Sequence, residues 1–483
     1  MFYASLLLML VILGRLAQLM FFSAENLQEM AENQWTREVA VSPQRGDILD
    51  RNGEILATSA TAESVLLYPK DIDDPGEVAS LLAPILGMDE QKIYDMAADQ
   101  SKVEVWLKRQ ITDDQAQAIR QLDLDGVDFF QDTKRYYPMG SFMSQVIGYT
   151  SADGVGQEGL EKRYNKYLAG YAGSILAQVD AEGRIIMDSK EVYIDPQPGL
   201  NLVLTSDAFI QSFAEAAAKE ALEEQKAKSV ACIVMDPRNA DILAMVNYPE
   251  ADLNDLDRSD LGALMEISRN TAIVDAYEPG STFKIITTAA ALDSGAASMD
   301  SSFTCSGYKL VDGEKIKCWR SGRPHGHQNL TEAVENSCNP AFMEMALDMG
   351  TDVFYDYIYD FGFGSATGVD YSADGAGIVR AAKYVKKVDL ARIGFGQSIA
   401  VTPLQLATAV SATINGGKLY TPRLAAAVKD SEGNVVEAFE SKEVRQVISP
   451  ETSASMRQIL ESVVENGGGK NARIPGYRIG GKT

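Results

Sequence analysis

Basic residues, cysteine and low-complexity tracts are all scarce in this chain of 483 residues. Lysine and arginine number 44 against 68 aspartates and glutamates, and the resulting formal charge of -24 disfavours a protein that binds nucleic acid by neutralising phosphates. Four cysteines are too few for a fold stabilised mainly by disulfides. Hydrophobic residues make up 46% and charged residues 23%, a balance typical of globular proteins, and the length corresponds to two to four domains.

The two ends of the chain are unusual. Residues 1–22 are almost entirely apolar, with Arg15 as the one charge, and their number is close to the ~20 residues that cross a bilayer core. We predict an uncleaved membrane anchor, with a cleaved signal peptide or a buried helix as the alternatives. The chain stops at Lys482-Thr483, directly after residues that resemble the start of a strand, so we expect both ends to be incomplete.

Turn residues divide the remainder into two predicted domains. Over residues 23–200, short mixed segments alternate with turns, and the Asn52-Gly53 pair between apolar runs predicts a β-hairpin, so we expect an irregular α+β domain. Over residues 201–483, Asp207 can cap a helix with Phe209 and Phe213 on one face. Paired strands are predicted at 230–235 and 242–246, and helices at 282–292, 331–337, 341–349 and 403–414. The prediction is a multidomain α+β protein whose second domain is a sheet flanked by helices.

The first candidate for chemistry is Ser281, three residues before Lys284 and at the expected start of a helix. That spacing places the two side chains on the same helix face. A serine hydroxyl becomes a good nucleophile when a neighbouring base takes its proton, and a buried lysine can be that base. Taken alone, Ser281 is better explained as a helix cap than as a nucleophile, and Ser306 with Lys309 has the same spacing without a helical run after it.

Two further polar pairs could complete a site. Ser337 and Asn339 precede Pro340, which fits the first turn of a helix, so their side chains could face a cleft and bind or protonate a substrate. Lys482 and Thr483 follow the expected final strand and could hold a carboxylate. Taken alone, the first pair is explained as a helix cap in a turn, and Lys482 as an ordinary lysine on an edge strand.

Together these three motifs resemble those of the class B penicillin-binding proteins, the monofunctional transpeptidases of peptidoglycan synthesis. The resemblance runs almost from end to end. Further hallmarks of the family have counterparts at residues 45–53, 135–140, 156–161, 396–397 and 402–405. Residues 318–319, 325–326 and 337–339 look most like the sporulation-specific members of Gram-positive spore formers. The implied organisation is an anchor over 1–22, a pedestal (dimerisation-type) domain over 23–200 and a β-lactamase-like transpeptidase domain over 201–483.

The resemblance also implies a reaction. Ser281 would attack the penultimate D-alanine carbonyl of a peptidoglycan stem peptide, Lys284 would take its proton, and Ser337 would pass a proton to the leaving D-alanine. Asn339, Lys482 and Thr483 would bind the substrate, and a stem-peptide amine would resolve the ester without metal or cofactor. β-Lactams would acylate the same serine. Alternatives are a β-lactamase or D,D-carboxypeptidase, in which water resolves the ester, and a non-catalytic penicillin-binding scaffold or sensor.

The family's location and partners follow from the same resemblance. It implies a single-pass cell-membrane protein whose catalytic domain lies outside the cytoplasm, acting in division or in spore cortex synthesis. A membrane glycan polymerase and divisome or sporulation proteins are the implied partners.

Two departures from the family pattern stand out: Ser398 occupies a position where glycine is usual, and the glycine and oxyanion-hole residue that follow the third motif lie beyond Thr483. The 483-residue chain is therefore expected to be inactive by itself.

The cysteines allow several arrangements. Cys338 lies inside the second motif, so a labile disulfide to Cys318 would connect the site to redox state. Pairing of Cys305 with Cys318, or four free thiols, are the other possibilities. The spacing of these residues and of the pair His325 and His327 matches no metal-binding signature, so no metal site is predicted.

Overall fold

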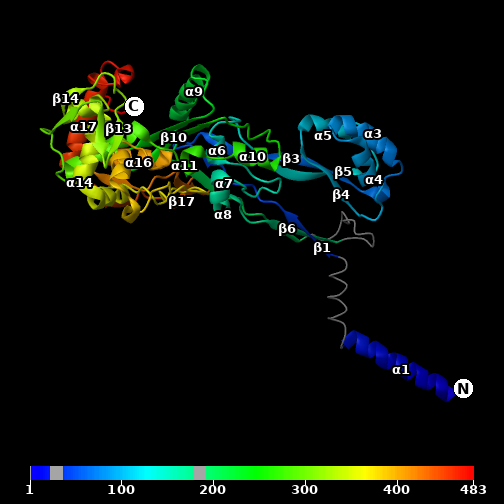
Figure 1. Cartoon of the computed structure of the whole chain (residues 1–483). Helices are drawn as coiled ribbons and strands as arrows, with labels where there is room; N and C mark the ends of the chain where they lie inside the picture. The colour runs from blue at the N-terminus through cyan, green and yellow to red at the C-terminus, as the bar shows by residue number, and fades with distance from the viewer. Residues whose placement is uncertain (1, 22–35, 179–191) are drawn as a thin grey trace.

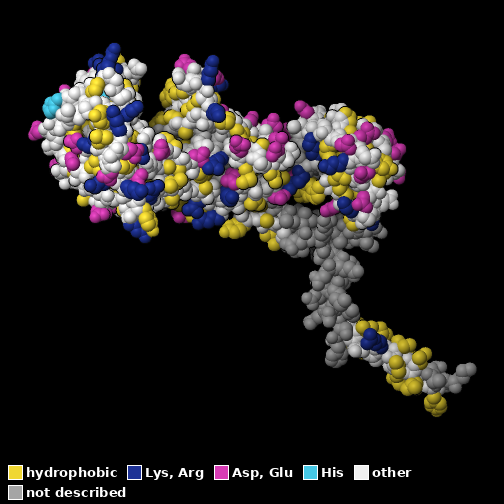
Figure 2. All heavy atoms as spheres, in the orientation of Figure 1, with side chains coloured by type: hydrophobic (Ala, Val, Ile, Leu, Met, Phe, Trp, Pro, Cys, Tyr) yellow, Lys and Arg dark blue, Asp and Glu magenta, His cyan; other side chains and the backbone are white. Residues whose placement is uncertain are grey.

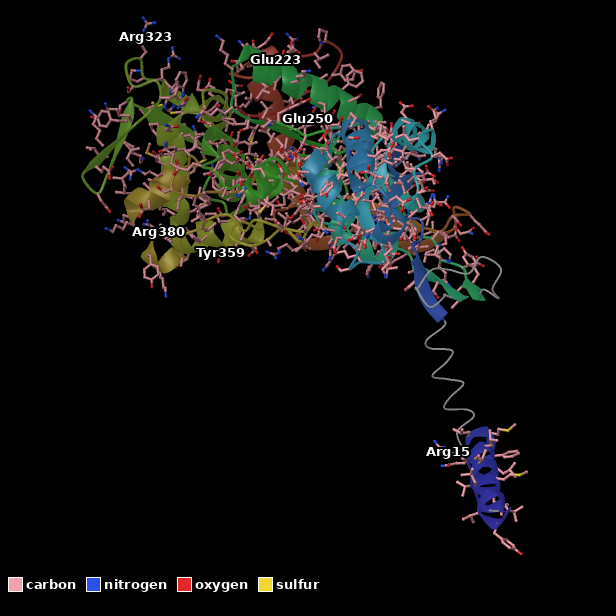
Figure 3. The ribbon with its side chains drawn as sticks, turned by 90° about the vertical axis from the view of Figure 1, so that its right-hand side faces the viewer. Arg15, Glu223, Glu250, Arg323, Tyr359 and Arg380 are labelled. Atoms are coloured by element: carbon pink, nitrogen blue, oxygen red, sulfur yellow. The ribbon has the colours of Figure 1, made fainter. Side chains whose placement is uncertain are left out.

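A computed structural model describes residues 2–21, 36–178 and 192–483, and Figure 1 shows an elongated molecule with α1 (Phe2–Phe21) set apart from the rest. Hydrophobic side chains cover much of α1 (Figure 2), and Arg15 projects from it (Figure 3). Among the described residues, no helix is both long enough and apolar enough to cross a membrane. Met1 and Phe22, the ends of the predicted anchor, lie outside the described residues.

The N-terminal unit is a twisted antiparallel sheet covered by helices, as the α+β prediction required. Gly53, with φ +95°, makes the predicted turn between β2 (Ile48–Leu49) and β3 (Ile55–Leu67). A full ten-residue register pairs β3 with β5 (Val127–Tyr136). The apolar faces of the covering helices pack on this sheet, and Asp74, Asp89 and Thr112 cap their N-termini. The elements are β2 (Ile48–Leu49), β3 (Ile55–Leu67), η1 (Pro69–Asp71), α3 (Pro75–Leu86), α4 (Glu90–Ala97), β4 (Val105–Ile111), α5 (Asp113–Arg120) and β5 (Val127–Tyr136).

A second small sheet and several short helices complete this unit. The sheet has the order β1-β6-β7. These elements are β1 (Thr36–Val41), α6 (Ser144–Ile147), α7 (Gly159–Arg163), α8 (Asn165–Leu168), β6 (Gly173–Gln178) and β7 (Val192–Ile194).

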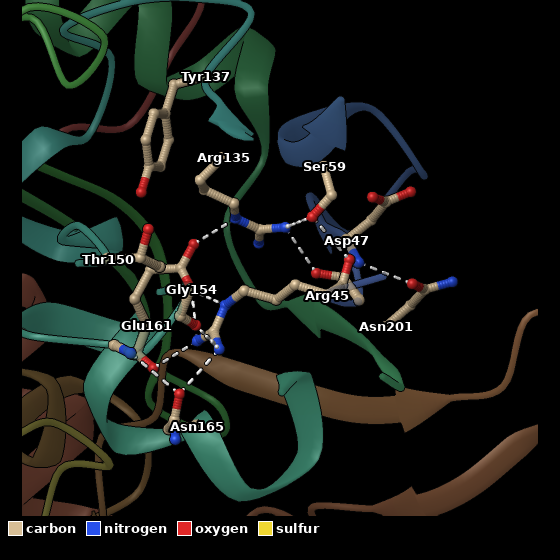
Figure 4. Close-up of polar contacts among 12 residues, drawn as sticks. Arg45, Asp47, Ser59, Arg135, Tyr137, Thr150, Gly154, Glu161, Asn165 and Asn201 are labelled. Atoms are coloured by element: carbon tan, nitrogen blue, oxygen red, sulfur yellow. Dashed lines mark hydrogen bonds and ion pairs between the residues drawn. The ribbon is translucent and has the colours of Figure 1, made fainter. Parts of the chain in front are cut away.

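A buried ion-pair network fastens the short helices to the sheet (Figure 4). Glu161 is fully buried, and its two carboxylate oxygens accept hydrogen bonds from Arg45 Nε and Arg135 Nε, each at 2.6 Å. The Arg45 guanidinium also donates to Asn165 Oδ1 at 2.7 Å. Burial lowers the pKa of Arg45 against the opposing effect of Glu161. Because the guanidinium groups of Arg45 and Arg135 are both buried away from water, they depend on the Glu161 carboxylate to balance their charge.

The two units share a sheet and a core. β2 pairs in parallel with β8 (Asn201–Leu204), which pairs with β16 (Ala425–Lys429) and through it with β17 (Val435–Ala438). The seven-stranded sheet thus continues from the N-terminal unit into the C-terminal one. One hydrophobic cluster joins Tyr137 and Phe142 to Leu404 and Leu424. The junction is therefore a packed interface and positions the two units relative to each other.

The predicted strand pair and capped helix of the C-terminal unit are confirmed. β9 (Val230–Asp236) pairs with β10 (Asp241–Tyr248), and the Asp207 side chain caps α9 (Ala208–Glu224). Ala214 and Ala218 pack on β10. Phe209 and Phe213 lie on one face of α9, as predicted, and their rings meet edge to face with centroids 4.8 Å apart. This face is not part of the core, because the two side chains are 70% and 62% exposed.

Helices form most of the remaining core. The helices α12 (Lys284–Asp293), α14 (Asn339–Asp360), α16 (Pro403–Ile414) and α17 (Pro450–Glu465) pack together, and α14 bends at Gly350, where φ is +74°. The helices here are α10 (Leu261–Ile267), α11 (Thr271–Val274), η2 (Gly280–Phe283), α12 (Lys284–Asp293), α13 (Leu330–Glu335), α14 (Asn339–Asp360), η3 (Ala382–Tyr384), α15 (Lys387–Ile393), α16 (Pro403–Ile414), α17 (Pro450–Glu465) and η4 (Lys470–Ala472). The remaining strands are β11 (Ser302–Cys305), β12 (Tyr308–Val311), β13 (Glu314–Lys317), β14 (Gly326–Asn329), β15 (Lys418–Tyr420) and β18 (Glu443–Gln446).

The predicted final strand is wrong. Residues 477–483 form no strand within the described chain, and Gly481 instead donates its N–H to the Leu460 carbonyl of α17. The predicted strand was based on the pattern of three residues. A strand also needs backbone hydrogen-bond partners on a neighbouring strand, and a local pattern does not specify these.

Candidate active site

Ser281 lies on a tight 3-10 turn that leads directly into α12. Gly280 before it has φ +56°, and its N–H donates to the Gly396 carbonyl at 2.9 Å. Gly396 has φ +81°, and a Cβ there would lie 2.0 Å from the Gly280 carbonyl oxygen. A side chain at Gly396 is therefore excluded, and this glycine pair fixes the backbone that carries the serine.

Lys284 is fully buried one turn after Ser281 and connects the first two motifs. Its Nζ donates to Ser337 Oγ and to the Ser337 carbonyl at 2.9 Å each, and to Asn339 Oδ1 at 2.7 Å. Ser337 Oγ in turn donates to Ser281 Oγ at 3.1 Å. The predicted residues thus form a continuous chain of hydrogen bonds from the amine to the hydroxyl of Ser281.

Burial sets the electrostatics of this chain. Desolvation, with a smaller contribution from the positive charge of Lys482, lowers the pKa of Lys284 to about 7. Desolvation also lowers the pKa of Lys482 to about 8. An amine with such a pKa can accept and return a proton near neutral pH, which an exposed lysine cannot.

The second motif is held on a strained turn. Ser337 has φ +49°, a left-handed conformation that is uncommon for serine. Trp319 Nε1 donates to the Asn336 carbonyl at 3.0 Å, immediately before this turn. Pro340 occupies the first turn of α14, as predicted. The turn directs the Ser337 hydroxyl toward Ser281 and the Asn339 amide oxygen toward Lys284.

These residues open on a cavity of about 610 Å³. Ser281, Ser337, Asn339, Lys482 and Thr483 all line it, so the fold brings the third motif to the first two without a strand. The residues that the sequence did not single out as site residues are Trp319, Arg320, Glu335, Asn336, Phe395, Gln397 and 466–468. Of these, Gln397 and Trp319 belong to hallmark segments, whereas the glycine-rich turn after α17 gave no local signal.

The departure at Ser398 has a structural consequence. This residue has φ +62°, which explains why glycine is favoured at the position. Its N–H donates to Glu278 Oε1 at 2.8 Å, which joins the loop after Gly396 to the segment before Ser281.

All four cysteines are free thiols in the described structure. Cys232 is half-buried on β9, as expected for a packed thiol, whereas Cys305, Cys318 and Cys338 are buried together behind the second motif. A hydrogen bond between Cys338 and Cys318 lowers the pKa of Cys318 and raises that of Cys338. The disulfide between these two residues stays a prediction. Although the sequence spacing argued against a metal site, the fold places His325 with these three thiols.

Comparison with known proteins gives a consistent picture. Residues 230–483 match the penicillin binding protein transpeptidase domain, and residues 40–204 match the penicillin-binding protein dimerisation domain. The chain is 39% identical to Stage V sporulation protein D of Bacillus subtilis over 98% of this chain and 73% of that protein. It is 31% identical to peptidoglycan D,D-transpeptidase FtsI of Escherichia coli over 99% of this chain and 79% of that protein. A peptidoglycan synthetase from Bifidobacterium adolescentis has a similar structure, with a TM-score of 0.71 and 26% identity over 92% of this chain and 84% of that one.

Proposed function

The chain belongs to the class B penicillin-binding proteins, and on this premise we propose that it is a peptidoglycan D,D-transpeptidase that works through an acyl-enzyme on Ser281. The observation that carries this proposal is the hydrogen-bond chain from Lys284 through Ser337 to Ser281. It supplies a base, a relay and a nucleophile in contact, and the relay and the nucleophile line one cavity.

In the acylation step, Ser281 Oγ attacks the carbonyl carbon of the penultimate D-alanine while its proton passes toward the Lys284 amine. The peptide bond to the terminal D-alanine breaks, and the proton returns through Ser337 to the leaving amine. An ester on Ser281 results. In the second step, the amine of a neighbouring stem peptide attacks this ester, forms the cross-link and releases the serine hydroxyl with its proton restored.

The remaining site residues would orient the donor peptide. Asn339 presents its amide at the cavity wall beside Lys284, where it can bind the peptide backbone. Lys482 and Thr483 lie at the same cavity, where an ammonium and a hydroxyl can hold the terminal carboxylate. A β-lactam presents a carboxylate and an acylating carbonyl in a similar arrangement, so it would react at the same serine.

We also propose a membrane location. The 20-residue helix α1 exposes a largely apolar surface apart from the body of the molecule, as a single-pass anchor would (Figure 2). The catalytic unit would then lie outside the cytoplasm with its peptidoglycan substrate. A membrane glycan polymerase and division or sporulation proteins are the partners that fit this location.

The intact mass of the protein after incubation with benzylpenicillin tests the proposal. In a chain continued past Thr483, we expect a penicilloyl adduct that is absent in Ser281→Ala and retained in Ser306→Ala, which removes the serine of the other Ser-x-x-Lys sequence. In the 483-residue chain measured alongside, we expect no adduct. A folded, continued chain that stays unmodified would overturn the nucleophile assignment. An adduct lost within seconds by hydrolysis would favour the β-lactamase alternative.

A further inference from the structure

An arginine without a partner lies at the cavity that holds Ser281. Arg320 follows β13 and lines this cavity together with Asn339 and Lys482. Its side chain is exposed, and within the described residues it forms no hydrogen bond or ion pair. We propose that Arg320 selects stem peptides that carry a carboxylate on the residues before the penultimate D-alanine, an inference that rests on the proposed transpeptidase function.

The unpaired state of Arg320 is unusual in the C-terminal unit. The other arginines in residues 230–483 bind an acidic side chain or a backbone carbonyl, and Arg238, Arg269 and Arg392 are examples that bind carboxylates. The exceptions among the described residues are Arg320 and Arg323. In a chain with a formal charge of -24, an arginine left without an acidic partner at a cavity is available to an external anion.

Backbone contacts place Arg320 beside the second motif. The N–H groups of Arg320 and Asn339 both donate to the Cys318 sulfur, so the two backbones lie on either side of one atom. Asn339 Nδ2 also donates to the Lys317 carbonyl at 3.4 Å, in the segment that leads to Arg320. Arg320 therefore stands at the wall of the cavity to which Asn339 belongs.

The path of the donor peptide leads from the reaction centre to this wall. In the proposed reaction, Lys482 holds the terminal carboxylate, Ser281 attacks the next carbonyl, and Asn339 binds the peptide backbone. The residues before the penultimate D-alanine then continue past Asn339 toward Arg320. Because an extended chain advances about 3.3 Å per residue, the two preceding residues lie within roughly 7 Å, a span that the long arginine side chain can bridge.

The other charged side chains of the cavity have different partners. Glu335 is the acidic residue among those that line it, and its carboxylate accepts a hydrogen bond from Ser462 Oγ. Lys482 is assigned to the terminal carboxylate. Arg320 remains for a second carboxylate, which its planar guanidinium can bind through two parallel hydrogen bonds.

A stem peptide can supply that carboxylate from two positions. The third residue carries one when it is diaminopimelate but not when it is lysine. The second residue, a glutamate linked through its γ-carboxyl, carries one when its α-carboxyl is not amidated. Both groups offer the same chemistry to Arg320, so the substrates of the test must separate them.

Three synthetic stem peptides make this separation. Each ends in D-lactate instead of the terminal D-alanine, so that attack by Ser281 forms the same ester on the serine and releases D-lactate with the proton. The reference peptide has lysine and an amidated second residue, the second peptide replaces lysine by diaminopimelate, and the third leaves the α-carboxyl free. With enzyme in excess, D-lactate release measured by chromatography reports the acylation rate.

The measurement uses the chain continued past Thr483. We expect one of the two carboxylate peptides to acylate it about tenfold faster than the reference peptide, and the faster one identifies the position of the carboxylate. In Arg320→Gln, the ratio of the two rates should fall to about one, and Arg320→Lys should keep part of the preference. Raising the ionic strength should reduce the ratio in the unaltered chain, because the bound charge is exposed to solvent.

Arg323→Gln is the matched control. Arg323 lies on the same loop, carries the same charge and also has no partner among the described residues, but it does not line the cavity and points away from the body (Figure 3). This variant should keep the full preference. If it loses the preference as Arg320→Gln does, a general effect of net charge replaces the proposed contact.

Two results would overturn the proposal directly: a ratio near one in the unaltered chain, or an unchanged ratio in Arg320→Gln. A ratio of rates is insensitive to partial loss of folded protein, because the same preparation is tested with each peptide. Benzylpenicillin identifies which assignment has failed. A penicilloyl adduct on Ser281 together with an unchanged ratio refutes the role of Arg320 alone, whereas a folded chain without an adduct refutes the transpeptidase assignment itself.

Discussion

Replacement of Gly396 by alanine tests how the nucleophile is positioned. The new Cβ would lie 2.0 Å from the Gly280 carbonyl oxygen, whereas ordinary contacts begin at about 3.4 Å, so the backbone must separate by more than about 1 Å. Gly280 immediately precedes Ser281, and the displacement therefore reaches the nucleophile. A misplacement of about 1 Å can cost a factor of about 100 in rate. We expect Gly396→Ala to slow benzylpenicillin acylation by about that factor in the chain continued past Thr483.

Gly295→Ala is the matched control. Gly295 has φ +75°, close to the +81° of Gly396, and lies just after α12, but a Cβ there meets no atom within 4 Å. Both substitutions should cost about 1 kcal/mol for an alanine in a left-handed conformation, and Gly396→Ala should lower the thermal midpoint further because of its backbone clash. Only Gly396→Ala should lose acylation rate, measured from the time course of a fluorescent penicillin. Equal acylation rates in two folded variants would refute the reasoning.

Three further outcomes follow from named contacts. Ser337→Ala removes the link between Lys284 and Ser281 and should slow acylation about 100-fold or more without preventing adduct formation, and an unchanged rate would exclude the relay. Glu161→Gln leaves two buried guanidinium groups unpaired and should destabilise the protein by about 3–5 kcal/mol in denaturant unfolding. The control Glu158→Gln breaks an exposed 3.6 Å ion pair with Lys162 and should cost less than about 1 kcal/mol. Ser398→Gly relieves a left-handed serine at φ +62° and should raise the thermal midpoint by about 1–3 °C, whereas a fall would show that the serine side chain contributes there.

The sequence predicted the features that depend on local spacing. One helical turn separates Ser281 from Lys284, so their proximity follows from the helix alone. The cap at Asp207 and the bounds of α16, 403–414, were also recognisable, because capping residues and a proline mark them directly. These signals lie within a few residues of the element that they define.

Tertiary placement decided what the sequence did not reveal. Phe209 and Phe213 form an apolar face as good as that of Ala214 and Ala218, and only the position of β10 selects the second face for burial. Likewise, Lys482 reaches the cavity from a segment beside α17, a route that no strand pattern describes. Contacts of this kind depend on elements far apart in the chain, so a local pattern cannot specify them.

The two halves of the catalytic chain are fixed by independent supports. The Ser281 turn rests on the backbone contact between Gly280 and Gly396, whereas the Ser337 turn rests on Trp319 and on the thiol cluster behind Cys338. Lys284 is the part common to both, because it begins α12 and binds the Ser337 turn. Since a single hydrogen bond of 3.1 Å joins the two serines, a small shift of either support lengthens the contact that proton transfer requires. Perturbations of the two supports should therefore converge on one measured quantity, the acylation rate, while altering stability in different parts of the fold.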